Sequence, residues 1–155
     1  ATTLDVYDFS RIEIYSTSQP LSYTDKRGVY DIHLNDSSTL LFSGGATESL
    51  KVGKNAQALL TGGTINLLTI YHYGSMTSSV TIDCKDGWQW LYTAGKVSGI
   101  TGVWQNGTPF QIEFVNPGSI FPDTWNFVHV IPEPATVALF GLSVIFLRRK
   151  GDKTQ

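Results

Sequence analysis

The chain has 155 residues, and 11 Lys and Arg oppose 13 Asp and Glu, which gives a formal net charge of −2 with only 15% charged residues. This length allows one ordinary domain with a short appendage and excludes a large multidomain enzyme. The charge balance is not basic and gives no electrostatic reason to expect a nucleic-acid partner.

The net charge conceals two regions of opposite sign. Residues 1–131 carry seven basic and eleven acidic side chains, a net charge of −4, whereas residues 132–155 carry four basic and two acidic ones, a net charge of +2. Fifteen Gly and many aromatic residues favour β-structure with frequent turns in the body. We therefore divide the chain into a β-rich domain over 1–131 and a distinct tail over 132–155.

The N-terminus begins with Ala and has neither a basic n-region nor an apolar h-region. This start suits a chain already cut after a small residue, so we expect the numbering to begin at or near a mature N-terminus. The first apolar segments, residues 5–9 and 12–15, are expected to cap one end of a repeat domain.

An internal repeat follows. Leu40-Leu41-Phe42-Ser43-Gly44-Gly45 aligns in register with Ala58-Leu59-Leu60-Thr61-Gly62-Gly63. A looser third copy contains Val80-Thr81-Ile82 after a short insertion. The resulting period of roughly 20 residues predicts a short β-solenoid, a parallel β-helix-like stack of repeat units.

The repeat predicts where strands and corners lie. We expect strands over 39–42, 49–52, 67–71 and 79–84, with turns at 35–38 and 54–55. The Gly-Gly pairs can adopt positive φ at sharp corners, where a Cβ would clash. A β-sandwich of hairpins remains the alternative fold, because short strands at regular intervals with turns between them also satisfy it.

The sequence shows few candidates for chemistry at single residues. Cys84 has no partner for an intrachain disulfide and ends an alternating segment, Val80 to Cys84, which predicts a buried thiol. His33, His72 and His129 are far apart in sequence and lack metal-ligand spacing. We therefore predict no metal and no cofactor.

Carboxylates in turns are the only candidates for catalysis. Asp83 and Asp86 flank Lys85, and Asp31 and Asp36 flank another expected turn. Paired carboxylates could cleave a polysaccharide, but acidic residues in turns usually cap the backbone or face solvent. We expect that the protein is not an enzyme and keep a polysaccharide-active enzyme as the less favoured reading.

Aromatic pairs support a second kind of function. In a strand, Trp88 and Trp90 would share one face, and so would Tyr71 and Tyr73, which could stack on sugars in a carbohydrate-binding module. Large aromatics in a small domain also close the ends of the core, so both readings remain open. Residues expected to close the second end are Trp104, Ile112, Phe114, Trp125, Phe127 and Val130.

The tail has three parts in order. Pro132-Glu133-Pro134 precedes the uncharged run 135–147, and Arg148-Arg149-Lys150 follows at once. As a helix the run would span about 20 Å, short of the ~30 Å hydrocarbon core of a bilayer. The basic cluster suits an end retained on the cytoplasmic side. We predict a short hydrophobic transmembrane helix over 135–147 with a basic tip.

These three parts resemble the PEP-CTERM sorting signal of bacteria. The resemblance implies an exported protein that sits at the inner membrane, transiently or permanently, where an exosortase-type membrane enzyme processes it for the cell surface or extracellular matrix. Residues 30–131 are similar to the Gly-Gly repeats of other proteins with this signal. The resemblance implies a non-catalytic protein of the cell envelope, biofilm or matrix, with exopolysaccharide as a candidate partner.

Overall fold

The computed structural model describes residues 3–15 and 29–132, which form twelve β-strands and one short 3₁₀ helix. The strands are β1 (Thr3–Val6), β2 (Arg11–Ile14), β3 (Asp31–Leu34), β4 (Thr39–Phe42), β5 (Ala46–Gly53), β6 (Gln57–Leu60), β7 (Thr64–Tyr71), β8 (Ser79–Cys84), β9 (Gln89–Thr93), β10 (Lys96–Val103), β11 (Pro109–Phe114) and β12 (Val128–Pro132). The 3₁₀ helix η1 covers Thr124–Phe127. The prediction of a mainly β fold is confirmed.

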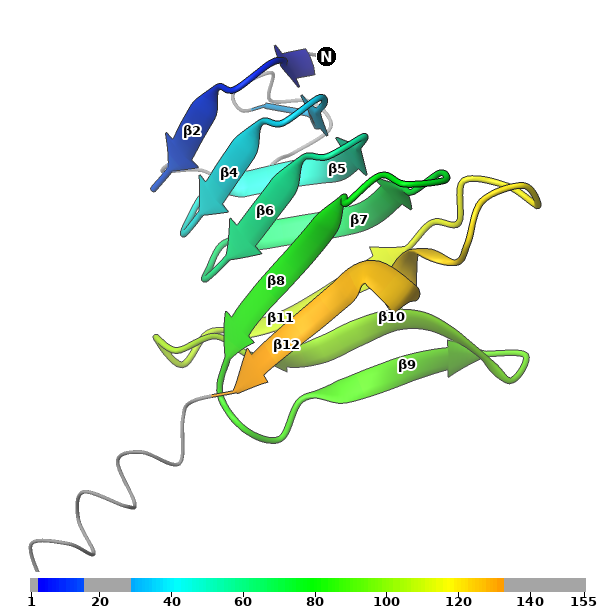
Figure 1. The fold of residues 1–155 in the computed structure, drawn as a ribbon. Helices are drawn as coiled ribbons and strands as arrows, with labels where there is room; N and C mark the ends of the chain where they lie inside the picture. Colours follow the sequence, from blue (N-terminus) through cyan, green and yellow to red (C-terminus); the bar gives the residue numbers. More distant parts are fainter. Residues whose placement is uncertain (1–2, 16–28, 133–155) are drawn as a thin grey trace, which may run out of the picture.

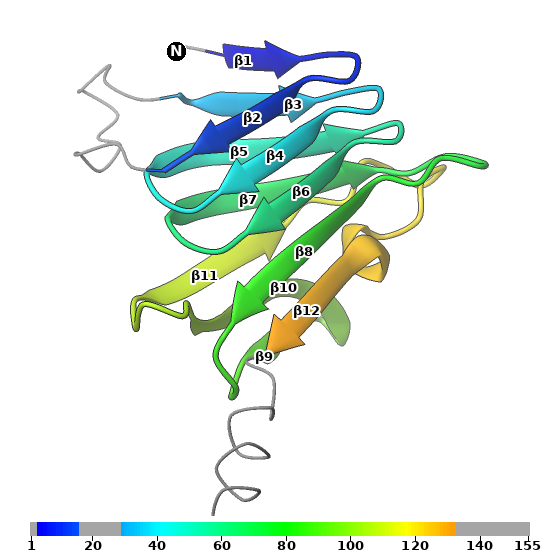
Figure 2. The same ribbon diagram turned by 60° about the vertical axis from the view of Figure 1, so that its left-hand side comes forward.

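The strands form two sheets, and from β1 to β8 successive strands alternate between them (Figure 1). The seven-stranded sheet has the order β1-β3-β5-β7-β11-β10-β9, and the five-stranded sheet has the order β12-β8-β6-β4-β2. Neighbouring strands of this region are parallel. We call β1 to β8 the repeat region and β9 to β12 with η1 the closing segment; Figure 2 shows them at opposite ends of the stack.

The strand register reproduces the sequence repeat. Thr39 pairs with Gln57, and Ser49 pairs with Leu67, so both sheets pair their strands at the same offset along the chain. Gln57 then pairs with Ser79, a longer offset that accommodates the insertion. The strands predicted over 39–42 and 79–84 have the same bounds as β4 and β8. The strands predicted over 49–52 and 67–71 lie within the longer β5 and β7. Among the described strands, antiparallel ladders join only β9 to β10 and β10 to β11.

The core lies between the two sheets, where inward positions repeat from strand to strand. Leu50 and Leu68 are register partners and are both completely buried, because residues one repeat apart stack directly on one another. Cys84 is also completely buried on the inward face of β8, as predicted from the alternation before it. The fully buried apolar side chains of the strands of the repeat region are Ile32, Leu34, Phe42, Leu50, Val52, Leu60, Ile65, Leu68, Ile70, Val80, Ile82 and Cys84.

The Gly-Gly pairs form the corners between the sheets. Gly45 and Gly63 have φ of 82° and 85°, a region that residues with a Cβ rarely adopt. A Cβ at Gly63 would also lie 2.5 Å from Cε1 of Phe42 and 2.8 Å from the carbonyl oxygen of Gly45. Both conformation and space therefore require glycine here, and the predicted corners are confirmed.

The segments expected at the N-terminal end of the stack form a further repeat unit there. Residues 5–9 and 12–15 include parts of β1 and β2, which are the end strands of the two sheets and pair in parallel with β3 and β4. The physical reason is their alternation: Leu4 and Val6, like Ile12 and Ile14, present two apolar side chains toward the core at the strand period. The same pattern that builds the other repeat units builds this one.

The closing segment follows a different plan. β9, β10 and β11 form an antiparallel meander. Its strand β11 pairs in parallel with β7, and β12 pairs in parallel with β8. Of the six residues expected to close this end, Trp104 and Ile112 are fully buried. Phe114, Phe127 and Val130 pack against the core. Trp125 differs, because it is 37% exposed on η1.

Candidate functional site

The last strand runs into the tail without a linker. β12 is an edge strand whose final residue, Pro132, is the first proline of Pro132-Glu133-Pro134 and pairs with Cys84 of β8. Proline is tolerated at this place because an edge strand need not donate on its outer side. Glu133, Pro134, the predicted helix over 135–147 and the basic residues Arg148, Arg149 and Lys150 lie outside the described residues. The boundary expected after residue 131 falls one residue inside the strand.

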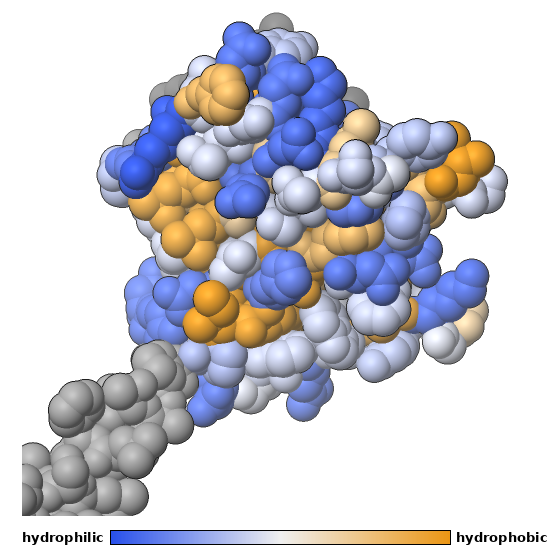
Figure 3. Space-filling view, in the orientation of Figure 1, coloured by the Kyte–Doolittle hydropathy of each residue, from blue (hydrophilic) through white to orange (hydrophobic). Residues whose placement is uncertain are grey.

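An apolar surface adjoins the end of β12 on the outer face of the five-stranded sheet. Figure 3 shows hydrophobic areas on this face, near the point where the chain leaves the domain. A shallow hollow of about 470 Å³ is lined there by Leu41, Leu59 and Ile131, with polar residues such as Gln57 and Thr81 around them. Leu59 is 39% exposed and Ile131 is 53% exposed. Ile131, the residue directly before the tail, thus borders an apolar surface.

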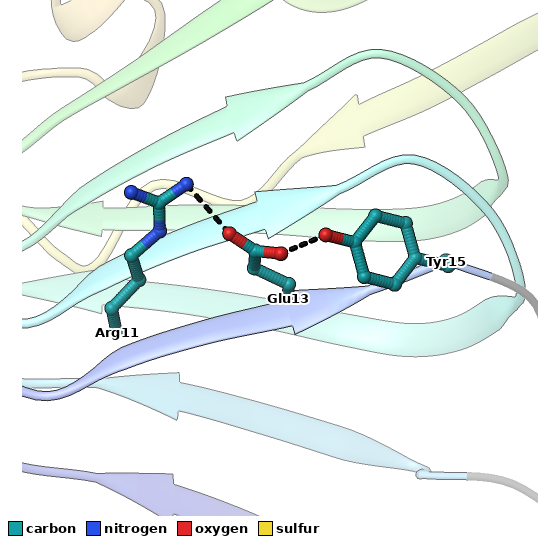
Figure 4. A network of polar contacts seen from close by, with 3 residues as sticks. All are labelled: Arg11, Glu13 and Tyr15. Atoms are coloured by element: carbon teal, nitrogen blue, oxygen red, sulfur yellow. Dashed lines mark hydrogen bonds and ion pairs between the residues drawn. The ribbon is translucent and has the colours of Figure 1, made fainter.

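A polar network lies at the opposite edge of the same sheet. Arg11, Glu13 and Tyr15 alternate along β2 and its end, so their side chains share one face (Figure 4). Arg11 Nη2 lies 2.6 Å from Glu13 Oε1, and the hydroxyl of Tyr15 donates to the other carboxylate oxygen. An ion pair this exposed contributes about 0–1 kcal/mol to stability. Its charges make the edge strand a poor template for pairing with another chain.

The two predicted indoles pack at the end of the core. Trp88 and Trp90 are half-buried, with ring centroids 5.0 Å apart and planes at 76°. Trp90 also meets Phe114 at 6.1 Å, and both indoles contact the core cluster. The rings therefore share one side of the segment, as predicted. Glycan stacking at Trp88 and Trp90 stays a prediction.

The two predicted tyrosines are more open. Tyr71 is 37% exposed and Tyr73 is 61% exposed, and the ring of Phe121 meets both, at centroid distances of 5.8 and 6.2 Å. His72 between them points elsewhere and stacks on Phe127 at 3.9 Å with an interplanar angle of 12°. We call Tyr71, Phe121 and Tyr73 the aromatic row. Phe121 comes from a distant loop, so no local pattern could have placed it there.

A polar hollow of about 240 Å³ lies beside the aromatic row on the outer face of the seven-stranded sheet. The residues that line it are His33, Leu34, Asn35, Lys51, Gly53 and Tyr71. Asn35, Gly53 and Tyr71 occupy equivalent positions of successive repeats and lie side by side at the ends of β3, β5 and β7. Sequence reasoning missed this hollow, although aligning the outward positions of the repeat would have brought the three residues together.

A chain of hydrogen bonds fixes one wall of this polar hollow. His33 Nδ1 lies 3.0 Å from Asp5 Oδ1, and Lys51 Nζ lies 3.1 Å from His33 Nε2. With a proton on Nδ1, the neutral imidazole donates to Asp5 and accepts from the ammonium group. Lys51 Nζ has further N–H groups that can donate into the hollow.

One carboxylate of each predicted pair contacts another side chain. Asp36 Oδ1 lies 2.5 Å from Lys54 Nζ, and this contact holds the pKa of the Asp36 carboxyl below its ordinary value and raises the pKa of Lys54. Gln105 Nε2 donates to Asp83 Oδ1 at 2.8 Å, whereas Asp86 is exposed in the following turn. Asp36, Asp83 and Asp86 thus have different neighbours: a lysine, a glutamine and solvent.

The remaining titratable candidates are spread over the fold. Burial raises the pKa of the Cys84 thiol, with smaller contributions from the charges of Asp83 and Asp86, so the reactive thiolate is disfavoured. His129 is exposed on β12, apart from the contacts of His33 and His72. In the described ranges, no three His, Cys, Asp or Glu residues group as metal ligands. Nor does any helix within 3–15 and 29–132 have the length and apolarity to span a bilayer.

Comparison with known families places one part of the chain. Residues 130–150 match the PEP-CTERM protein-sorting motif, which begins inside β12 and ends with the basic cluster. No curated protein and no solved structure matches the chain. The chain therefore carries a PEP-CTERM sorting signal. This signal marks an exported protein that is held briefly at the membrane and sorted by an exosortase enzyme.

Proposed function

We propose that this chain is a non-catalytic protein of the cell surface or extracellular matrix, associated with biofilm or exopolysaccharide, which reaches its place through its C-terminal signal. The observation that carries the proposal is the sorting motif over residues 130–150, directly attached to a β domain. The domain 3–132 would be the cargo. The helix over 135–147 would hold it in the inner membrane until an exosortase-type enzyme acts.

The attachment of the tail supports this order of events. Ala135 is the third residue after Pro132, and an extended chain spans at most about 3.6 Å per residue. The first residue of the apolar run therefore lies within about 11 Å of the end of β12. A membrane-embedded helix would keep the domain against the outer face of the bilayer.

We further propose that the cargo is a short β-solenoid. Alternation of strands between two sheets, parallel pairing and a repeated offset between paired strands all support this assignment. A stack of this kind needs no catalytic centre to be useful, because it presents regular rows of side chains on its outer faces. The contacts of Asp36 with Lys54 and of Asp83 with Gln105 also favour a structural role for these acids.

Deletion of residues 133–155 tests the proposed sorting, because it removes the tail and leaves β12 complete. Cell fractionation should show the full chain in the envelope or matrix and the truncated chain released in soluble form. Unchanged membrane retention and sorting of the truncated chain would overturn the proposal.

Point variants and intact mass test processing more finely. Glu133→Gln changes the centre of the Pro-Glu-Pro motif, and Asp152→Asn is a matched control beyond the basic cluster. We expect mass spectrometry of the recovered protein to show loss of the residues after the Pro-Glu-Pro region in the parent and in Asp152→Asn. Glu133→Gln should retain them. Equal processing of all three would show that Glu133 is not recognised.

A second candidate function is carbohydrate binding. The observation that favours it is the aromatic row, which keeps Tyr71 and Tyr73 exposed on either side of Phe121. A glycan array should show binding that falls in Tyr71→Ala and Tyr73→Ala. Loss in Trp88→Ala and Trp90→Ala instead would move the site to the end of the core, and absence of binding to any glycan would exclude this function.

A further inference from the structure

Gly53 lines the polar hollow and, because it has no side chain, leaves space there. Its backbone is not in the positive-φ region, so the strand does not require glycine there. An added Cβ would lie 3.4 Å from Asn35 Oδ1 and 3.9 Å from Cβ of Tyr71, which is ordinary contact. A Cβ is therefore accommodated at this position and would take up part of the hollow. Glycine in a strand is one of the features that mark a place where a ligand or another backbone approaches closely.

The groups around this hollow are complementary to one another. On one side Lys51 supplies N–H groups, and His33, which contacts both Lys51 and Asp5, holds the Lys51 ammonium in place. Asn35 adds an amide with both a donor and an acceptor. Tyr71 lines the other side, and its ring is held in position by its contact with the ring of Phe121. Aromatic surface beside a few oriented polar groups is the usual composition of a small-molecule site.

A second hollow continues the first along the sheet. Its volume is about 220 Å³, and it shares Lys51 with the polar hollow. Tyr30, Asp31 and Glu48 are among the residues that line it. The two hollows therefore adjoin at Lys51, with Tyr71 lining the first and Tyr30 lining the second.

We propose that the polar hollow binds one neutral sugar residue of a glycan chain, with the next residue in the adjoining hollow. The inference rests on the carbohydrate-binding function proposed above. A pyranose presents an apolar C–H face and a rim of hydroxyl groups. Tyr71 covers such a face, and Lys51 and Asn35 reach the hydroxyl groups.

Charge decides between neutral and acidic sugars. Asp31 and Glu48 line the second hollow, whereas Lys51 is the single Lys or Arg among the residues that line the two hollows. Asp5 adds a further negative charge behind His33. The body of the chain also has a net charge of −4. A uronic acid polymer or a nucleic acid would meet more repulsion than attraction on this face. Neutral hexose or pentose units fit the site better.

The experiment uses the full chain in a zwitterionic detergent without a sugar headgroup. Calorimetric titrations use neutral gluco-, xylo- and manno-oligosaccharides, with oligogalacturonate as the acidic comparison. Gly53→Val fills the hollow with a residue that suits a strand, and Tyr71→Ala removes the stacking surface. Tyr92→Ala is the matched control, because Tyr92 is 64% exposed on β9, away from the hollow.

We expect at least one neutral oligosaccharide to bind, more tightly than its monosaccharide. Gly53→Val and Tyr71→Ala should each weaken binding about tenfold or more, whereas Tyr92→Ala should change it less than about twofold. Thermal unfolding of each variant confirms that it is folded. Neutral-glycan binding that Gly53→Val and Tyr71→Ala both leave unchanged would overturn this site while keeping a carbohydrate-binding function. Preference for oligogalacturonate would overturn the assignment to neutral sugars, and binding of no glycan would overturn both proposals.

Discussion

The repeat region and the closing segment bury their apolar side chains by different means. In the repeat region, each strand pairs with the strand one unit away, and buried residues such as Leu50 and Leu68 stack at a fixed offset. In the closing segment, strands turn antiparallel, and Trp104 takes the place of a stack of aliphatic side chains. A repeat can continue indefinitely, but its end needs a separate solution.

Trp104 joins the two regions. Its ring stacks on Phe110 at 4.1 Å, and its Nε1 donates to the carbonyl oxygen of Gly63 at 2.9 Å. Gly63 is a corner of the repeat region, so this one side chain connects the last fully regular corner to the closing strands. We infer that the two regions unfold together.

The largest effect is expected from Trp104→Ala. Removing a fully buried indole leaves a cavity and an acceptor without its donor, and should lower the free energy of unfolding by about 3–5 kcal/mol. Urea denaturation followed by circular dichroism measures the loss, and Trp125→Ala, 37% exposed, should cost under about 1 kcal/mol. A transition of the closing segment that precedes loss of the parallel sheets would show that the two regions are independent.

A smaller effect is expected at the corner itself. Gly63→Ala forces a Cβ into a positive φ and against Phe42 and Gly45, and should cost about 2–4 kcal/mol. Gly107→Ala, in a turn of the closing segment, has φ of 90° but nothing within 4 Å of the added Cβ, and should cost about 1–2 kcal/mol. Both are measured as changes in the urea midpoint. Equal losses would mean that backbone conformation alone, and not the closeness of the stacked corners, sets the requirement.

The smallest effect is expected from the pair of Asp36 and Lys54, which joins two turns of the repeat region. The lowered pKa of Asp36 means that its contribution is present above 3.8, the ordinary value, and is lost as the pH falls through the folded pKa. The raised pKa of Lys54 means that its contribution is lost as the pH rises through a value above 10.5. Asp36→Asn should flatten the acid limb of a stability profile measured by urea denaturation. A profile identical to that of the parent would show that this pair contributes nothing measurable to the pH dependence of stability.

Predictions from the sequence succeeded mainly in the repeat region and the tail. Strands over 39–42 and 79–84, the Gly corners and the buried Cys84 could be predicted because each depends on residues close in sequence or on the period itself. The tail motif could be found for the same reason, since its three parts are contiguous. Residues 5–9 and 12–15 lie at the expected end of the stack, but the long segment before β3 separates them from the repeat in the sequence, so their strand pairing could not be predicted.

The sequence by itself determined the repeat, its corners and the sorting signal. Only the tertiary structure decided how the stack ends, which outward residues meet and where the tail leaves the fold. β12 pairs with β8 and β11 with β7 across long stretches of chain, and Phe121 reaches Tyr71 from a distant loop. Such contacts have no period and no local propensity. They form because the exposed end of an apolar stack must be covered, and many sequences could cover it.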